Sequence, residues 1–264
     1  MTDETPAIQH DVPQTARIWN YWLGGKDHFP VDRQVGDDIL KVIPDMALMA
    51  RATRDFLKRA VHHLAADLGV RQFLDVGTGL PTADNVHQVA QRAAPSVRVV
   101  YVDNDPLVLA HARALLTSSR EGRTAYLDAD LREPERIIAG AADTLDFEQP
   151  VALLLMGILG HITDYDEARA IVRRLTAALP SGSYLAVYDA TNVVDPATAK
   201  AAEIWNASAE PPYVLRSPAQ IEGFFEGFEL LPPGVVSCPL WHPPAADIGE
   251  ITPIDEFCGV GRKP

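Results

Sequence analysis

The spacing of apolar residues along the chain changes near residue 69. Before that point it is helical: apolar residues recur at every fourth position from Leu48 to Leu64, which predicts one long helix over residues 45–68. Gly69 supplies a stop signal at the end of this helix. An aromatic stretch at residues 15–23 also favours a helix, which stops at the Gly-Gly pair that follows it. The first part of the chain is therefore expected to be helical.

After residue 69, short apolar stretches alternate with amphipathic helical patterns. The stretches that predict strands lie at residues 72–76, 98–102, 124–127, 151–156 and 184–188. Strands that alternate with helices in this way form a parallel sheet covered on both faces. Residues 228–231 and 235–238 flank a Pro-Pro-Gly turn and predict an antiparallel hairpin at the sheet edge, and residues 257–260 close the chain. We therefore expect a single doubly wound α/β domain.

Composition and charge narrow the class of protein. The 264 residues are 47% hydrophobic, enough for a substantial core, and 23 basic against 36 acidic side chains give a formal charge of −13. That charge argues against nucleic acid and anionic membrane as partners, because phosphate groups are bound by lysine and arginine. No apolar run approaches the roughly 20 residues of a membrane span, no secretory signal opens the sequence, and the only cysteines are Cys238 and Cys258. We expect a cytoplasmic protein, and the sequence leaves its oligomeric state open.

A glycine-rich turn follows the first predicted strand. The sequence FLDVGTGLPT contains Gly77 and Gly79, which allow the backbone to turn sharply and approach a ligand closely. The helix expected from Pro81 to Ala93 would offer free N–H groups to that ligand. Acids end the next two strands: Asp103 is placed to accept from ribose hydroxyls, and Asp130 from an adenine amino group. These positions together predict a nucleoside site, although a structural turn with surface acids has the same pattern.

Two features distinguish among nucleoside ligands. A dinucleotide site is typically Gly-x-Gly-x-x-Gly or Ala, but the sixth position counted from Gly77 is Thr82, and Pro81 stiffens the turn. Asp75, just before the glycines, would also repel a diphosphate. A carboxylate there suits a ligand with a cationic amino-acid tail. The sequence thus favours S-adenosyl-L-methionine as the cofactor over a nicotinamide dinucleotide.

Three stretches of the sequence resemble a known family. They are ARIWNYWLGGKD at residues 16–27, FLDVGTGLPT at 73–82 and YVDNDP at 101–106. The chain resembles class I S-adenosylmethionine-dependent methyltransferases, and more closely a family first catalogued as a domain of unknown function and since grouped with S-adenosyl methyltransferases. The likeness extends over residues 15–261, and the Gly-Gly-Lys-Asp stretch is its most specific part. One departure is Pro81, where many class I enzymes carry a third glycine.

The resemblance implies a fold and a domain organisation. The fold is Rossmann-like, with a seven-stranded, mostly parallel sheet, an antiparallel edge hairpin and an N-terminal helical cap. Residues 1–264 then form a single methyltransferase domain. Within it, the resemblance and the apolar pattern place a flexible tail at residues 1–12, the helical cap or lid at 13–68 and the catalytic core at 69–264.

The resemblance also implies contacts with the nucleoside part and the amino group of the cofactor. Gly77 and Gly79 would pass beneath the methionine part, and Asp75 would help to hold its ammonium group. Asp103 would bind the ribose, and the neighbouring Asn104 is a further candidate for binding the cofactor.

Further contacts are implied at the adenine and at the cofactor carboxylate. Asp130 and the backbone of Leu131 would read the adenine edge. Arg54 lies on the long helix before the first strand, where a similar arginine in leucine carboxyl methyltransferase relatives meets the carboxylate; arginine can hold such a group through two hydrogen bonds. Arg51, one helical turn away, competes for this role, and surface salt bridges are the alternative for both arginines.

The aromatic N-terminal stretch has two interpretations. It is either a helix that packs on the core, or a lid, hinged at Gly24 and Gly25, that closes over cofactor and substrate and excludes water. If it is a lid, Tyr21, Lys26 and Asp27 lie near the mouth of the pocket.

Methyl transfer mainly requires that the acceptor atom be aligned with the methyl group, and a base is needed only if the acceptor must lose a proton. His161, just past the strand at 151–156, is the candidate base, although a lone histidine also fits a structural role. Asp189 and Asn192 are expected to follow the strand at 184–188 and to line the acceptor pocket. No spacing of histidines or cysteines indicates a metal site.

The acceptor is expected to be a small molecule. A helical insertion at residues 195–207 and the following Pro211-Pro212-Tyr213 segment are expected to wall an enclosed pocket, which favours a small molecule methylated on oxygen or nitrogen. Two alternatives stay open: a non-catalytic regulatory module that binds S-adenosylmethionine, and an NAD(P)-dependent oxidoreductase.

Overall fold

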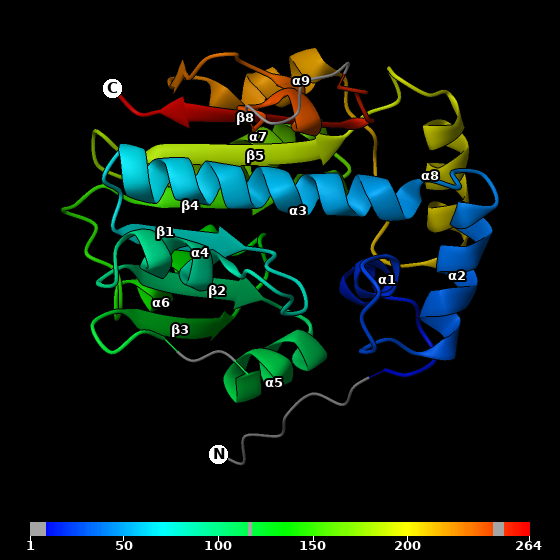
Figure 1. Ribbon diagram of the computed structural model, residues 1–264, viewed down its shortest axis with the longest axis horizontal. Helices are drawn as coiled ribbons and strands as arrows, with labels where there is room; N and C mark the ends of the chain where they lie inside the picture. Colours follow the sequence, from blue (N-terminus) through cyan, green and yellow to red (C-terminus); the bar gives the residue numbers. More distant parts are fainter. Residues whose placement is uncertain (1–8, 116–117, 245–250) are drawn as a thin grey trace.

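An eight-stranded sheet forms the centre of the molecule in a computed structural model that describes residues 9–115, 118–244 and 251–264 (Figure 1). The strands are β1 (Gln72–Val76), β2 (Arg98–Asp103), β3 (Arg123–Asp128), β4 (Ala152–Met156), β5 (Tyr184–Ala190), β6 (Glu229–Leu230), β7 (Val236–Ser237) and β8 (Glu256–Arg262). The α-helices are α1 (Thr15–Trp22), α2 (Pro30–Leu40), α3 (Met46–His62), α4 (Val86–Ala93), α5 (Pro106–Leu115), α6 (Pro134–Ala141), α7 (Tyr165–Ala177), α8 (Ala197–Ser208) and α9 (Pro218–Glu222). Shorter helical turns are η1 (His63–Asp67), η2 (Leu159–His161), η3 (Gly223–Phe225) and η4 (Cys238–Leu240).

The order of the strands creates a switch point between β1 and β4. Along the sheet the order is β3-β2-β1-β4-β5-β8-β6. The first five strands in this order are parallel to one another, and β8 is antiparallel to its neighbours. This confirms the predicted class of fold, a mostly parallel sheet with an antiparallel edge. In such a sheet a ligand binds beyond the carboxyl ends of the strands at the switch point.

The edge of the sheet differs from the prediction in one respect. The hairpin expected between residues 228–231 and 235–238 is wrong, because β6 and β7 do not pair with each other. Each pairs instead with β8, β6 near its end and β7 near its beginning. The seven-residue β8 is long enough to hold both short strands along one edge, so that β7 becomes an eighth strand off the main path.

Helices cover both faces of the sheet, as its apolar strands require. Neighbouring residues of a strand point to opposite faces. Phe73 packs in one core cluster with residues of α3 and α4, whereas Leu74 packs in another with residues of α6 and α7. Asp75 therefore points to the same face as Phe73, toward α3.

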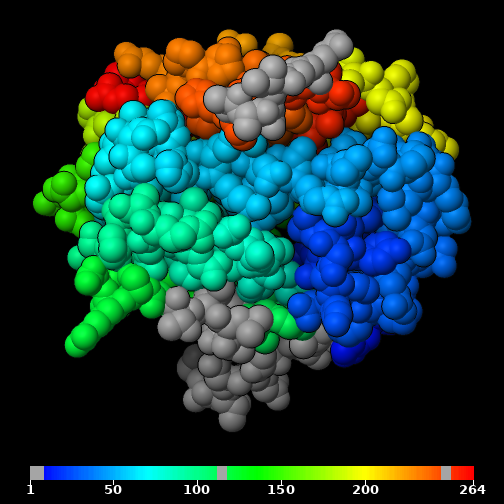
Figure 2. Space-filling model, viewed as in Figure 1, coloured from blue at the N-terminus to red at the C-terminus, as the bar shows by residue number. Residues whose placement is uncertain are grey.

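The N-terminal helices lie at the carboxyl ends of the strands. α1 and α2 share an apolar cluster with the beginning of α3 and with α8 (Figure 1). Figure 2 shows α1, in dark blue, next to the light-blue part of α3. Arg17 Nε of α1 lies 3.0 Å from the Asp32 carboxylate of α2, and both side chains are buried. Loss of either partner would leave a buried charge without its ion partner, so the ion pair fastens α1 to α2.

Several helix boundaries follow from capping residues. The predicted long helix is confirmed as α3, which continues as the π-helical turn η1. The helix expected from Pro81 begins only at Val86, because the side chains of Asn85 and Gln88 form a capping box there. Helix α2 was not predicted, although Pro30 at its first position is a start signal.

The predicted tail at residues 1–12 is described only in part, since residues 1–8 lie outside the described residues. The carbonyl oxygens of Gln9 and Val12 both accept hydrogen bonds from the Arg17 guanidinium. Residues 9–12 are thus tied to α1. Within the described ranges, no helix combines the length and the apolarity that a bilayer crossing requires.

Candidate active site

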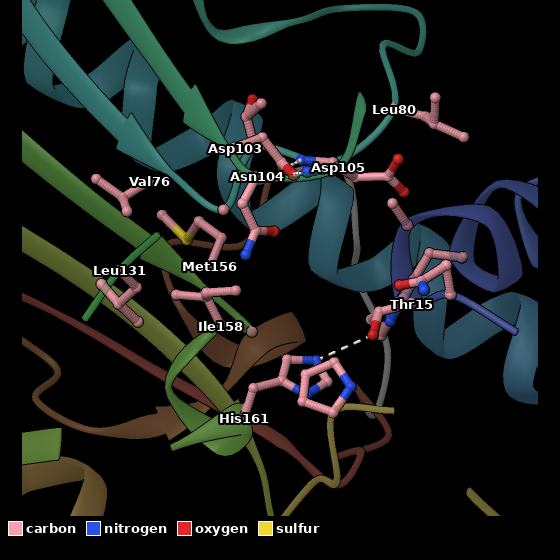
Figure 3. A pocket seen from close by; sticks show the side chains of 18 of the residues that line it. Thr15, Val76, Leu80, Asp103, Asn104, Asp105, Leu131, Met156, Ile158 and His161 are labelled. Carbon is pink, nitrogen blue, oxygen red and sulfur yellow. Dashed lines mark hydrogen bonds between the residues drawn. The ribbon is translucent and has the colours of Figure 1, made fainter. Parts of the chain in front are cut away.

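A cavity of about 200 Å³ lies beyond the carboxyl ends of β1, β2 and β4, at the switch point of the sheet (Figure 3). Helix α1 and the loops after β1, β2, β3 and β4 form most of its wall. Of the predicted site residues, those that line the cavity are Arg54, Gly77, Gly79, Asp103, Asn104, Asp130, Leu131 and His161. The sequence thus places part of this wall, and the roles of these residues stay predictions.

The turn after β1 keeps both glycines at the cavity. Gly77 has a φ of +75° and Gly79 a φ of +66°, in the left-handed region that favours glycine. A Cβ on Gly77 would lie 2.6 Å from Ile158 Cγ1, whereas one on Gly79 would meet only Ala16 Cβ, at 4.0 Å. Gly77 is therefore required by its backbone and by close packing, while Gly79 leaves space toward α1.

Asp103 ends β2 at the wall of the cavity. Its Oδ2 accepts a hydrogen bond from the Gly79 amide, and its Oδ1 accepts one from the Asp105 amide, both at 2.9 Å. Burial raises the pKa of Asp103 to about 6, although these backbone hydrogen bonds act to lower it. Near neutral pH the carboxylate is held in a fixed orientation, and each oxygen keeps a free lone pair that could accept from a ligand hydroxyl.

Asp75 does not line the cavity. It points toward α3, and the Thr78 hydroxyl donates a hydrogen bond to its Oδ2 at 2.9 Å. Burial raises the pKa of Asp75 to about 6, while the Thr78 hydrogen bond and the nearby positive charge of Arg54 act to lower it. Asp75 holds the turn through Thr78, on the side that faces α3. This position does not favour the expected direct contact with a ligand ammonium group.

Arg54 and Arg51 are separated by their positions on α3. Arg51 is exposed, whereas Arg54 lines the cavity and donates from Nη2 to Thr82 Oγ1 at 2.6 Å. The Arg54 Nε is buried and has no hydrogen-bond partner among the described residues. A buried N–H without a partner is costly, so this side chain is suited to an anionic ligand group.

The loops after β2 and β3 meet in the wall of the same cavity. Asn104 donates from Nδ2 to Asp130 Oδ2 at 3.1 Å, and the Arg132 amide donates to Asp130 Oδ1 at 2.8 Å. Leu131 is buried beside them. The carboxylate of Asp130 is thus already oriented by neighbouring groups, and the amide of Asn104 faces the cavity in Figure 3.

His161 lies in the cavity wall next to the beginning of α1, where Figure 3 shows its contact with Thr15. Its Nδ1 is 3.1 Å from the Pro212 carbonyl oxygen, and its Nε2 is 3.1 Å from Thr15 Oγ1. Because a carbonyl can only accept, this network assigns the proton to Nδ1 and leaves Nε2 as an acceptor. Burial lowers the pKa of His161 below its ordinary value, although its backbone hydrogen bonds act to raise it. The imidazole is therefore neutral near pH 7, and its Nε2 accepts a hydrogen bond from the Thr15 hydroxyl.

The predicted residues of the N-terminal stretch lie away from the cavity. The Tyr21 hydroxyl donates to Asp37 Oδ1 at 2.5 Å, on the α2 side. Lys26 is exposed, and the Asp27 amide donates to Asn20 Oδ1 at 3.0 Å. None of the three predicted residues lines the cavity.

A different face of α1 lines it, and the residues there were missed from the sequence. They are Gln14, Thr15, Ala16, Trp19, Asn20 and Leu23. Their spacing of three or four residues is the signal that could have grouped them on one helix face.

Asp189 and Asn192 also lie outside the cavity wall. Asp189 was expected to follow the fifth strand, but β5 continues through Ala190 because β8 pairs with it to that point. Its buried carboxylate accepts from Arg216 Nη1 at 3.0 Å and from the Tyr213 hydroxyl. Asn192 is exposed. The expected role of both residues in an acceptor pocket is not supported by these positions.

A second cavity of about 90 Å³ adjoins the first. The two share Thr15, Trp19 and Gly157 in their walls. Helix α8 and Tyr213 form one side of the second cavity, where the sequence predicts an enclosed pocket. In the part of the chain that the structure describes, no group of three or more histidine, cysteine or acidic side chains is arranged to hold a metal ion.

Comparison with known proteins relates this architecture to one family. The sequence profile of the family described as S-adenosyl methyltransferase matches residues 1–264. The crystal structure of a DUF574 family protein from Streptomyces avermitilis MA-4680 is 45% identical, with 98% of this chain and 100% of that chain covered and a TM-score of 0.94. A protein from Thermobifida fusca YX, provisionally assigned as a methyltransferase, is 37% identical, with 100% and 99% covered and a TM-score of 0.88.

A more distant structure shares the fold alone. The plantazolicin methyltransferase BamL, solved with a triazolic desmethylPZN analogue and SAH, is 11% identical, with 94% of this chain and 95% of that chain covered and a TM-score of 0.56. A search of curated proteins found no match.

Proposed function

The chain belongs to the S-adenosyl methyltransferase family, and on this premise we propose that it methylates an oxygen or nitrogen atom of a small molecule held in the second cavity. Membership of the family makes S-adenosylmethionine the cofactor and sets the oxidoreductase alternative aside. The observation that carries the proposal is the small second cavity, which shares three wall residues with the cavity at the switch point. Its volume of about 90 Å³ suits part of a small molecule and not a folded polymer.

The residues of the first cavity fit the cofactor. The buried Arg54 Nε, which has no partner among the described residues, supports a bidentate contact with the cofactor carboxylate. Asp103 would accept from the ribose hydroxyls, and Asn104 and Asp130 would lie at the adenine. Gly79 would leave room for the methionine part. When bound, the cofactor supplies a methyl group that its sulfonium has already activated.

His161 is the base in this proposal. Its neutral imidazole holds Nε2 as an acceptor, and its Nδ1–H is anchored on the Pro212 carbonyl. In this role His161 would take up at Nε2 the proton that the acceptor atom loses when it is methylated. The Thr15 hydroxyl donates to Nε2 at 3.1 Å and lines both cavities, so it would relay the proton from the acceptor to Nε2.

Helix α1 acts as a lid over the cofactor in this proposal. One face of α1 closes the first cavity, and Thr15 and Trp19 on that face also reach the second. A helix that contacts both cavities would exclude water from the reacting atoms once it is seated. Its ion pair with α2, through Arg17, supports a shared movement of the two helices.

Release of S-adenosylhomocysteine tests the proposal. The protein is incubated with S-adenosylmethionine and a mixture of small hydroxyl and amino compounds, and the product is quantified by mass spectrometry. We expect product only when an acceptor is present. If the protein binds S-adenosylhomocysteine but releases none with any small acceptor, while it methylates macromolecules, the small-molecule proposal is wrong.

A further inference from the structure

Glu256 lies in the wall of the second cavity. It is the first residue of β8, pairs with Ala190 of β5, and is 4% exposed. Its Oε2 is buried and has no hydrogen-bond partner among the described residues. A carboxyl group is costly to bury without a partner, so a ligand that supplies one would be bound with a substantial gain.

The two acidic neighbours of Glu256, Asp189 and Asp255, both have partners within the fold. Asp189 is paired with Arg216 and accepts from Tyr213. Asp255 accepts four hydrogen bonds of 2.7–2.9 Å, which hold the loop before α8. The donors are Thr191 Oγ1, Thr198 Oγ1 and the amides of Val194 and Asp195. Glu256 differs from both, because nothing in the described structure explains an acid at its position.

The surroundings of Glu256 favour a cation with an apolar body. Tryptophan rings from α1 and α8, at Trp19, Trp22 and Trp205, line the same cavity. Indole faces attract cations as well as apolar groups. Burial raises the pKa of Glu256 well above its ordinary range, and the negative charges of Asp189 and Asp255 raise it further. A positively charged group beside Glu256 would oppose all three effects.

From this geometry we propose that the second cavity binds a small amine, with its apolar part among the tryptophan rings and its ammonium group paired with Glu256. The proposal deepens the proposed function and rests on it, since it gives the class of the methyl acceptor. The ammonium group satisfies the buried carboxyl and anchors one end of the acceptor. The opposite end of the molecule, which would carry the oxygen or second nitrogen that is methylated, then lies beside Thr15 and Gly157, in the wall that both cavities share.

Two probes of equal size test the charge requirement. The full chain, saturated with S-adenosylhomocysteine, is titrated by calorimetry with benzylamine, which is protonated at neutral pH, and with benzyl alcohol, which is neutral. We expect benzylamine to bind at least about tenfold more tightly. If benzyl alcohol binds equally well, the cavity selects a neutral donor; if benzylamine does not bind at all, it is not an amine site. Either result overturns the inference.

Substitutions test whether the preference for benzylamine arises from Glu256 in the second cavity. Glu256→Gln keeps the shape of the side chain and removes its charge, so benzylamine affinity should fall at least about tenfold while benzyl alcohol affinity stays the same. Glu203→Gln is the matched control, because Glu203 is exposed on α8 and does not line the cavity. Ala202→Leu, which fills the cavity from α8, should abolish binding of both probes. Unchanged benzylamine affinity in either cavity variant would overturn the inference.

Titration with S-adenosylhomocysteine distinguishes failure of the proposed function from failure of the amine inference. All variants should bind S-adenosylhomocysteine like the wild type, because Glu256 and Ala202 do not line the first cavity. If S-adenosylhomocysteine does not bind, the proposed function is wrong, and the amine inference that rests on it is wrong too. If it binds and a small acceptor is methylated, but benzylamine is not preferred, only the amine inference fails.

Discussion

The carboxylate of Asp103 is the most direct place to test the cofactor site. It holds the Gly79 and Asp105 amides, one on each oxygen, and lines the cavity. Asp103→Asn keeps one oxygen for the Asp105 amide but turns an NH₂ group toward the Gly79 N–H. The substitution also removes the negative charge that would accept from a ribose hydroxyl. We expect cofactor affinity to fall.

The magnitude follows from the hydrogen bond that is lost. A hydrogen bond to a charged group contributes about 1.5–3 kcal/mol, which corresponds to an increase of about 10- to 150-fold in Kd. Because the pKa of Asp103 is raised to about 6, the carboxylate is ionised at about pH 8 and mostly protonated at about pH 5. The difference between wild type and variant should therefore be largest at the higher pH and shrink at the lower one.

Calorimetric titration with S-adenosylhomocysteine at both pH values measures this difference. Asp128→Asn is the matched control, since Asp128 ends the neighbouring strand as the register partner of Asp103, is exposed, and does not line the cavity. The control should bind like the wild type. An Asp103→Asn variant that is folded and binds with unchanged affinity at about pH 8 would refute the reasoning and place the ribose elsewhere.

Four other substitutions test three separate parts of the account. The pKa of Asp75 is raised from 3.8 to about 6 on folding. Protonation of Asp75 therefore stabilises the folded state fully below pH 3.8, and this stabilisation is lost as the pH rises through about 6. The free energy of unfolding should fall by up to about 3 kcal/mol over this range, and Asp75→Asn should flatten the urea-denaturation profile; superimposable profiles would contradict this. His161→Asn should lower turnover by about 10²- to 10⁴-fold while S-adenosylhomocysteine affinity is kept, and full turnover would remove it as the base. Gly77→Ala should destabilise the fold by about 1–3 kcal/mol, because its φ is positive and its Cβ would meet Ile158. Gly79→Ala should cost less in the same urea measurement, and an equal cost would show that the contact with Ile158 does not matter.

Local signals in the sequence were sufficient for the central sheet and for part of the site. The strand ends that carry Asp103 and Asp130 follow directly from the alternation of apolar strands and helices. Parallel strands bring their carboxyl ends to one edge of the sheet, so residues far apart in sequence are expected to meet there. This is why part of the wall formed by the loops after the strands was predictable, whereas the part formed by α1 was not.

Residues whose positions depend on pairing between distant segments were not predictable. Asp189 lies inside β5 only because β8 extends that strand through Ala190, and the same pairing places Glu256 at the second cavity. Side-chain direction also decided the outcome for Asp75, which points toward α3 and not into the cavity. Neither strand pairing nor this direction is encoded in a short sequence motif.

The boundary of α4 shows how two local signals can compete. Pro81 is a typical first residue of a helix, but the Asn85 amide donates to Gln88 Oε1 in a capping box that starts the helix at Val86. The capping box decided the position, so the helix begins after the turn and not within it. The first turn of α4 consequently does not line the cavity.

Transfer of a labelled methyl group tests the central claim most directly. The full chain is incubated with S-adenosylmethionine that carries a deuterated methyl group and with a cell extract, which is then separated into small-molecule and macromolecular fractions. The account predicts that the label appears in a small molecule, and that Ala202→Leu, which fills the second cavity, prevents this. Label found only in the macromolecular fraction, or unchanged in the Ala202→Leu variant, would contradict it.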